Sequence, residues 1–185
     1  MKVIPTLHPA ALMRDPTLWG AVVADLERAK AQAGTPTYSA PNVEWVPVET
    51  VAQLRITLAA LPSSLGPTVL DVETSGLTLM CVGLCQTPPL AYVIDGRIVQ
   101  RATRTFQAWL NKQTIIMHNA VFDIGVLTRA GLHVPTWEDT MLLHHTCYAE
   151  LPHSLAFIQS IYTPLPYHKH LAPGHTQIEE STDAD

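Results

Sequence analysis

VLDVETSGL, residues 69–77, places two acids, Asp71 and Glu73, where a short apolar run gives way to polar residues. Side chains of a β-strand alternate between its two faces, so we expect both carboxylates on the same face of one strand. A second stretch, HNAVFDIGVL at 118–127, supplies a third acid, Asp123, in what reads as the first turn of a helix. Hard divalent cations take oxygen ligands, so these carboxylates predict a metal site.

The composition is typical of a globular protein with one core and a small annex. The chain has 185 residues, of which 47% are hydrophobic and 15% charged. Apolar runs are broken before the roughly 20 residues that a membrane span needs, and the N-terminus has no signal-peptide pattern. These features predict a cytoplasmic protein without a membrane partner. Three scattered cysteines predict no disulfide framework, and the absence of a CxxC pair argues against zinc.

The net charge of the chain does not decide whether its partner is a nucleic acid. A formal net charge of −5 argues against broad electrostatic binding of nucleic acid, but not against a nucleic-acid enzyme whose metal ions offset acids in its site. The segment 97–112 carries four basic residues and no acid. It is either a solvated helix face or a patch that contacts a phosphate backbone. The pair His168 and His170 could suggest zinc, but it lacks cysteine partners and a regular histidine spacing.

Hydrophobic periodicity predicts an N-terminal annex followed by the main fold. Residues 1–33 read as a strand, a loop and a helix, with Asp15 as N-cap and Pro16 in the first turn. Gly34–Pro47 reads as a linker, and a helix is expected over 49–61. The expected divisions are an annex at 1–33, a linker and helix at 34–66, the main domain at 67–170 and a polar tail at 171–185.

The main domain reads as three meandering strands followed by alternating helices and strands. This order favours an α/β fold, a mixed sheet with helices on its faces. The expected strands are 69–73, 77–85, 90–95 and 114–118, with a short one near Val134. The expected helices are 100–111, 121–130, 139–148 with Asp139 as N-cap, and 154–162.

The two acidic stretches resemble motifs one and two of the DEDD 3′–5′ exonucleases. This group includes the proofreading domains of family A DNA polymerases and the DnaQ-like nucleases. The resemblance covers about 68–170 and rests on DVETSGL, on the pattern N-x-x-F-D-x-x-x-L and on the segment EDTMLL. Residues 138–169 look like the corresponding segment of phage-type polymerases. The resemblance implies a ribonuclease-H-like fold and two divalent ions, Mg²⁺ or Mn²⁺.

Roles follow for the matching positions only. The resemblance implies that Asp71 bridges the two ions, that Glu73 completes one shell and that Asp123 acts on the second ion. It implies that the terminal nucleotide is lined by Thr74, Leu77, Asn119 and Phe122. The expected substrate is the 3′ end of single-stranded DNA, and the expected partner is a DNA polymerase domain or a downstream polypeptide.

The chain departs from the family at motif three. That motif places a fourth acid, an Asp, four residues after a Tyr or five after a His, which positions or deprotonates the attacking water. No Tyr or His after Leu142 has an Asp at either spacing, and the nearest mimic is His175 with Glu180. Two explanations stay open: the third motif is encoded downstream, or the catalytic set is incomplete. Weak or absent nuclease activity is expected for this chain.

The N-terminus resembles a second family. IPTLHPAALMRDPTLW looks like the last segment of bacterial-type uracil-DNA glycosylases, in which an H-P-[AS]-x-x-x-R loop leads into a terminal helix. His8, Pro9 and Arg14 match this loop, whose His contacts a flipped uracil in that family. The family's uracil-pocket motif and iron–sulfur cysteines are missing, so the segment is expected to be a remnant without glycosylase activity.

Two hypotheses of different classes result. The first is a proofreading-type exonuclease domain with an incomplete catalytic set. The second is a non-catalytic nucleic-acid-binding or assembly module that keeps the exonuclease fold. A third and weaker one is a glycosylase fragment that only docks to DNA.

Overall fold

The computed structural model describes residues 4, 6–35 and 42–163. The described residues divide into two compact units, one formed by 4, 6–35 and 150–163 and the other by 42–149. The first unit contains α1 (Pro9–Arg14), a 3-10 turn η1 (Pro16–Leu18), α2 (Trp19–Gln32) and α8 (Leu155–Tyr162). Within this unit, the Arg28 side chain on α2 donates to the carbonyl oxygen of Ser160 on α8.

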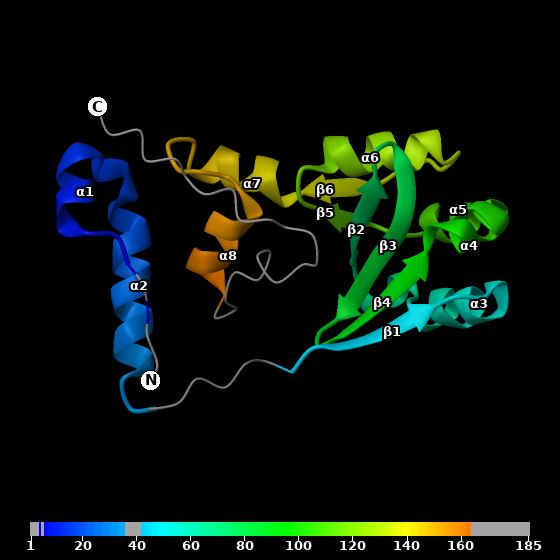
Figure 1. The fold of residues 1–185 in the computed structure, drawn as a ribbon, viewed down its shortest axis with the longest axis horizontal. Helices are drawn as coiled ribbons and strands as arrows, with labels where there is room; N and C mark the ends of the chain where they lie inside the picture. The colour runs from blue at the N-terminus through cyan, green and yellow to red at the C-terminus, as the bar shows by residue number, and fades with distance from the viewer. Residues whose placement is uncertain (1–3, 5, 36–41, 164–185) are drawn as a thin grey trace. The chain divides into compact units, whose positions relative to one another are not determined.

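The second unit is built on one mixed sheet of six strands in the order β1-β4-β3-β2-β5-β6 (Figure 1). The strands are β1 (Glu44–Val48), β2 (Thr68–Ser75), β3 (Thr78–Thr87), β4 (Leu90–Asp95), β5 (Ile115–Met117) and β6 (Trp137–Asp139). Pairing is antiparallel between β2 and β3 and between β3 and β4, and parallel elsewhere. The predicted α/β class with a mixed sheet is confirmed.

Helices pack on this sheet in two groups (Figure 1). They are α3 (Val51–Ala60), α4 (Gly96–Arg101), α5 (Thr103–Leu110), α6 (Ala120–Arg129) and α7 (Thr140–Cys147), with a 3-10 turn η2 (Ser63–Leu65) after α3. The first group, α3 to α5, contacts β1, β3 and β4, while α6 packs on β2 and β3 and α7 contacts β6. Fully buried side chains, among them Leu54, Leu70, Phe106 and Leu127, join both groups in one core.

The segment predicted as a linker ends in a strand. Glu44–Val48 forms β1 and pairs in parallel with β4, although it lies inside the predicted linker Gly34–Pro47. Pro47 argues against a strand in the sequence because proline lacks the N–H that a central strand needs. The strand β1 tolerates it because it lies at the edge of the sheet and has a partner on one side only. The sheet therefore begins before residue 67.

The helix predicted over 100–111 is two helices, α4 and α5. Asp95 caps α4 four residues earlier than expected, since its carboxylate accepts a hydrogen bond of 2.7 Å from the Arg97 N–H. The next residue, Gly96, has to be a glycine, because a Cβ at this position would meet the Leu79 carbonyl oxygen at 2.2 Å. The break between the helices falls at Ala102, where ψ is 28°. A local pattern of apolar residues cannot show this break.

Two smaller expectations differ from the structure. The short strand expected near Val134 is present as β6 but begins three residues later, because β6 pairs with β5 over only three residues and shows no alternating pattern of its own. Pro9–Arg14 forms a helix where a loop was expected. The helices α6, α7 and α8 lie where they were predicted within one or two residues. None of the described helices is long and apolar enough to cross a membrane, and the cytoplasmic setting stays a prediction.

Candidate active site

Strand β2 displays Asp71 and Glu73 on one face, as its sequence predicted. Leu70 and Val72, which alternate with them along the strand, are buried, while Asp71 and Glu73 are exposed. On the neighbouring strand β3, Gly83 lies opposite Asp71 and Cys81 lies opposite Glu73. The glycine leaves no side chain on the neighbouring strand beside the Asp71 carboxylate. A β-bulge after Glu73 then shifts the register, a feature that often redirects side chains beside active sites.

Helix α6 brings Asp123 against this strand. Asp123 lies in the first turn of α6, is 2% exposed, and accepts a hydrogen bond of 3.2 Å from the Val72 N–H through Oδ1. Burial, and next the negative charge of Asp71, raise the pKa of Asp123 to about 7. The hydrogen bond from Val72 opposes this shift only in part. Asp71 and Asp123, 52 residues apart in the sequence, therefore belong to one electrostatic site.

A third aspartate, Asp139, fixes the start of α6 from a different element. Its carboxylate accepts hydrogen bonds from the backbone N–H groups of Asn119 (3.0 Å), Ala120 (2.9 Å) and Met141 (2.8 Å). Asn119 has φ 63° and gives α6 no side-chain cap, so Asp139 caps α6 as well as its own helix α7. Burial would raise the pKa of Asp139, but these hydrogen bonds outweigh it and hold the pKa below its usual value.

The predicted nucleotide-lining residues lie at two places in the second unit. Thr74 and Leu77 lie at the end of β2 and in the turn to β3, where Leu77 is 76% exposed. Asn119 and Phe122 lie at the start of α6, where Phe122 is 49% exposed. The exposure of Phe122 shows that its side chain is not part of the buried core. Roles in nucleotide binding stay predictions for all of these residues.

The glycosylase-like residues lie in the first unit. The His8 ring accepts a hydrogen bond of 3.1 Å from the Ala10 N–H and thereby caps α1. Arg14 lies in the last turn of α1 and is exposed. The cap gives His8 a structural role, and any part in DNA contact stays a prediction.

The acids of this site suit a hard cation in their chemistry. Burial, and next the charge of Asp71, raise the pKa of Asp123, and a divalent cation would relieve the repulsion between the two carboxylates. In the part of the chain that the structure describes, however, no three His, Cys, Asp or Glu side chains are arranged closely enough to hold a metal ion. Metal binding by Asp71, Glu73 and Asp123 is therefore a matter for proposal.

Sequence reasoning missed two residues at this site. The role of Asp139 at α6 has no local signal, because its partners Asn119 and Ala120 lie about twenty residues earlier. Cys81 lies across from Glu73, and the pKa of its thiol is raised by burial and next by the charges of Glu73 and Asp71. The predicted hairpin of β2 and β3 could have suggested that neighbour, had the register been assigned.

A family model described as 3′-5′ exonuclease matches residues 46–170. The chain belongs to this exonuclease family. The match includes both acidic stretches and, unlike the predicted domain, also α3 and the last three residues of β1. It confirms the resemblance to the DEDD exonucleases. The phage-type origin and the glycosylase remnant stay predictions.

Solved structures confirm the ribonuclease-H-like fold of the exonuclease domain. RNase D of Escherichia coli, described as an exoribonuclease involved in structured RNA processing, superimposes with a TM-score of 0.57 at 17% identity, over 73% of this chain and 39% of that one. The Nibbler EXO domain of Aedes aegypti gives 0.56 at 13% identity, over 77% and 80%. A protein from Bifidobacterium adolescentis gives 0.53 at 19%, over 65% and 30%.

The chain thus spans about a third of the length of two of these structures. No curated protein sequence matches the chain. Likeness at these identities shows the fold alone, so substrate and activity are argued below from this chain's own residues.

Proposed function

We propose that the chain holds divalent ions, Mg²⁺ or Mn²⁺, through Asp71, Glu73 and Asp123 and hydrolyses phosphodiesters at the 3′ end of single-stranded DNA. The observation that carries the proposal is the placement of Asp123. This carboxyl group is buried, is held against β2 by the Val72 N–H, and has a pKa raised by burial and by Asp71. A buried acid that faces a second acid is costly for folding alone, so a cation-binding role accounts for it.

Each element of the site has a part in this proposal. When bound, a pair of divalent ions supplies a hydroxide nucleophile at neutral pH and stabilises the leaving 3′ oxygen. Strand β2 orients Asp71 and Glu73, and Asp139 fixes the turn from which α6 presents Asp123. The exposed side chains of Leu77 and Phe122 offer apolar surface on which the terminal base can stack, with Thr74 and Asn119 beside them.

The catalytic rate is proposed to be low. Motif three, which supplies the fourth acid of the family, has no match in the sequence, and its nearest mimic, His175 with Glu180, lies outside the described residues. A site with three acids in place of four holds its ions weakly. We further propose that the chain is of phage-like origin and acts in DNA replication, where it proofreads beside a DNA polymerase.

A second candidate function is a non-catalytic module that binds nucleic acid or assembles with a partner. It is favoured by the fact that no metal-holding group of three side chains is in place among the described residues. The glycosylase-like segment with His8 and Arg14 would then contribute only docking to DNA. This candidate and the first differ in one observable, the shortening of a bound strand.

The test uses single-stranded DNA and RNA oligonucleotides labelled at the 5′ end and incubated with Mn²⁺ or Mg²⁺. Slow, metal-dependent shortening from the 3′ end is expected on DNA, with loss in Asp71→Ala and in Asp123→Ala. Glu138→Ala is the matched control, because Glu138 is an exposed acid of the same sheet in β6. Shortening should be unchanged in this control.

Three outcomes would count against the proposal. Shortening that persists in Asp71→Ala would remove the acids from the mechanism. Metal-linked binding of the oligonucleotide without any shortening would favour the non-catalytic module. A rate typical of proofreading domains would contradict the incomplete catalytic set.

A further inference from the structure

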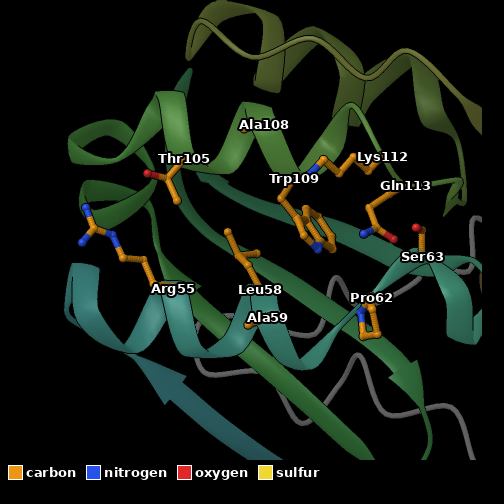
Figure 2. Close-up of a pocket in the computed structure, with 10 residues that line it drawn as sticks. All are labelled: Arg55, Leu58, Ala59, Pro62, Ser63, Thr105, Ala108, Trp109, Lys112 and Gln113. Atoms are coloured by element: carbon orange, nitrogen blue, oxygen red, sulfur yellow. The ribbon is translucent and has the colours of Figure 1, made fainter.

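A groove lies between α3 and α5 (Figure 2). The acids of the candidate active site are not among its lining residues. Its volume is about 360 Å³. None of its lining residues belongs to β2, β3 or α6, the elements that carry Asp71, Glu73 and Asp123. It is therefore a separate feature of the sheet unit, and the proposed chemistry makes no use of it.

Two helical stripes form the walls of this groove. On α3 and the residues after it, Arg55, Leu58, Ala59 and Pro62 recur at positions i, i+3, i+4 and i+7. The same spacing recurs on α5 and the residues after it, with Thr105, Ala108, Trp109 and Lys112. Residues at this spacing share one face of a helix, so two helix faces oppose one another across the groove.

One end of the groove is closed by hydrogen bonds to a single carbonyl group. The Leu61 carbonyl oxygen accepts hydrogen bonds from the Trp109 indole N–H (2.9 Å) and from the Gln113 side-chain Nε2 (3.1 Å). These contacts fix the orientation of the Gln113 amide, which is 4% exposed. The walls and this end are thus held in place by the fold itself.

The same orientation leaves the other atom of the Gln113 amide unsatisfied. Oε1 of Gln113 is buried and has no hydrogen-bond partner among the described residues, yet Gln113 lines the groove beside Ser63 (Figure 2). A buried acceptor without a donor is unfavourable for the folded chain. A ligand that presents an N–H group at this end would satisfy it.

Charge in the groove favours an anion. Arg55 lies near Thr105 at one end, Lys112 lies toward the Gln113 end, and the Trp109 ring lies between them (Figure 2). No acid lines the groove, and neither Arg55 nor Lys112 forms a salt bridge with another described residue. The groove thus combines a hydrogen-bond acceptor, an aromatic wall and cationic ends.

We propose that this groove binds a nucleoside 5′-monophosphate. A base N–H would donate to Gln113 Oε1, the base and sugar would lie against Trp109 and Leu58, and the phosphate would lie toward Arg55 and Thr105. A nucleotide combines these three properties in one small molecule, whereas a simple anion uses only the cations. The proposal does not depend on nuclease activity at the acids of β2.

The test is calorimetric titration of the full chain with guanosine 5′-monophosphate in buffer with EDTA, which prevents metal-dependent binding at the other site. Guanosine 5′-monophosphate is chosen because the guanine edge carries N–H donors. Saturable binding is expected, weakened roughly tenfold or more in Arg55→Glu, which reverses the charge beside the phosphate, and in Ala108→Trp, which fills the groove from an exposed position. Matched controls are Arg101→Glu and Ala52→Trp, exposed positions outside the lining, which should leave the affinity within about twofold.

Inorganic phosphate and guanosine are titrated separately to distinguish parts of the ligand. Each is expected to bind at least roughly tenfold more weakly than the nucleotide. Equal affinity for inorganic phosphate would overturn the proposal in favour of a simple anion site. Binding that is unchanged in Ala108→Trp would overturn the location, and an absence of saturable binding to the wild-type chain would overturn the proposal as a whole.

Discussion

The N-termini of α6 and α7 each hold a buried aspartate, and the two carboxyl groups differ in what surrounds them. Asp139 at α7 is 4% exposed and accepts three backbone N–H hydrogen bonds. Asp123 in α6 is 2% exposed, accepts one such bond from the Val72 N–H, and interacts unfavourably with the charge of Asp71. The pKa of Asp139 is lowered and that of Asp123 is raised to about 7. Equal burial therefore does not imply equal surroundings: hydrogen bonds favour the charged form of Asp139, whereas burial and a neighbouring charge disfavour the charged form of Asp123.

The largest expected effect concerns Asp139. Asp139→Ala removes the acceptor of three hydrogen bonds at two helix starts and is expected to lower the free energy of unfolding by about 4 kcal/mol at pH 7. Urea denaturation followed by tryptophan fluorescence measures this loss. Glu138→Ala is the control and should stay within about 0.5 kcal/mol of the wild type. A loss as small as that in Asp139→Ala would show that α6 does not depend on this cap.

The next effect concerns the pH dependence of stability in metal-free buffer. The pKa of Asp123 in the folded chain is about 7, above the usual value of about 3.8, so the folded state binds more protons between these values. As the pH rises from about 4 to 7, the Asp123 carboxyl ionises in the unfolded chain before it does in the folded chain, so the free energy of unfolding falls. Asp123→Asn keeps an acceptor for the Val72 N–H but cannot ionise. At pH 8 it should exceed the wild type in stability by about 2 to 4 kcal/mol, and at pH 4 the two should be similar.

Denaturation of both chains across this pH range, with EDTA present, separates the alternatives. Parallel pH curves for wild type and Asp123→Asn would show that Asp123 is not perturbed by its surroundings, and would remove the contrast with Asp139.

A smaller effect concerns Asn119, whose backbone N–H donates to Asp139 at the start of the helix that carries Asp123. Asn119 adopts φ 63° and ψ 52°, a left-handed conformation that costs other L-residues about 1 to 2 kcal/mol. Asn119→Ala is expected to lower the free energy of unfolding by about 1 kcal/mol, and Asn119→Gly to stay near the wild type. Thermal unfolding measures both variants. Equal losses in the alanine and glycine variants would point to the Asn119 side chain itself in place of the backbone.

The contrast between the two aspartates also shows how far the sequence could be read. Alternation in β2 predicted that Asp71 and Glu73 share a face, and helical spacing predicted Asp123 in the first turn of α6, because both signals are local. The capping of α6 by Asp139 depends on β6 lying beside β5, which only the assembled sheet determines. Strand β1, which contains Pro47, also depends on its pairing with β4, and the start of α4 at Gly96 depends on close contact with β3. Neither could be predicted from the local sequence. The raised pKa of Asp123 required its burial against β2, which no local pattern shows.

The most direct test of the central claim is calorimetric titration of the metal-free chain with Mn²⁺. We predict saturable binding in the wild type, its loss in Asp71→Ala and in Asp123→Asn, and its retention in Glu138→Ala. Mn²⁺ binding of the same affinity in Asp123→Asn as in the wild type would contradict the claim that this buried carboxylate and Asp71 form the metal site.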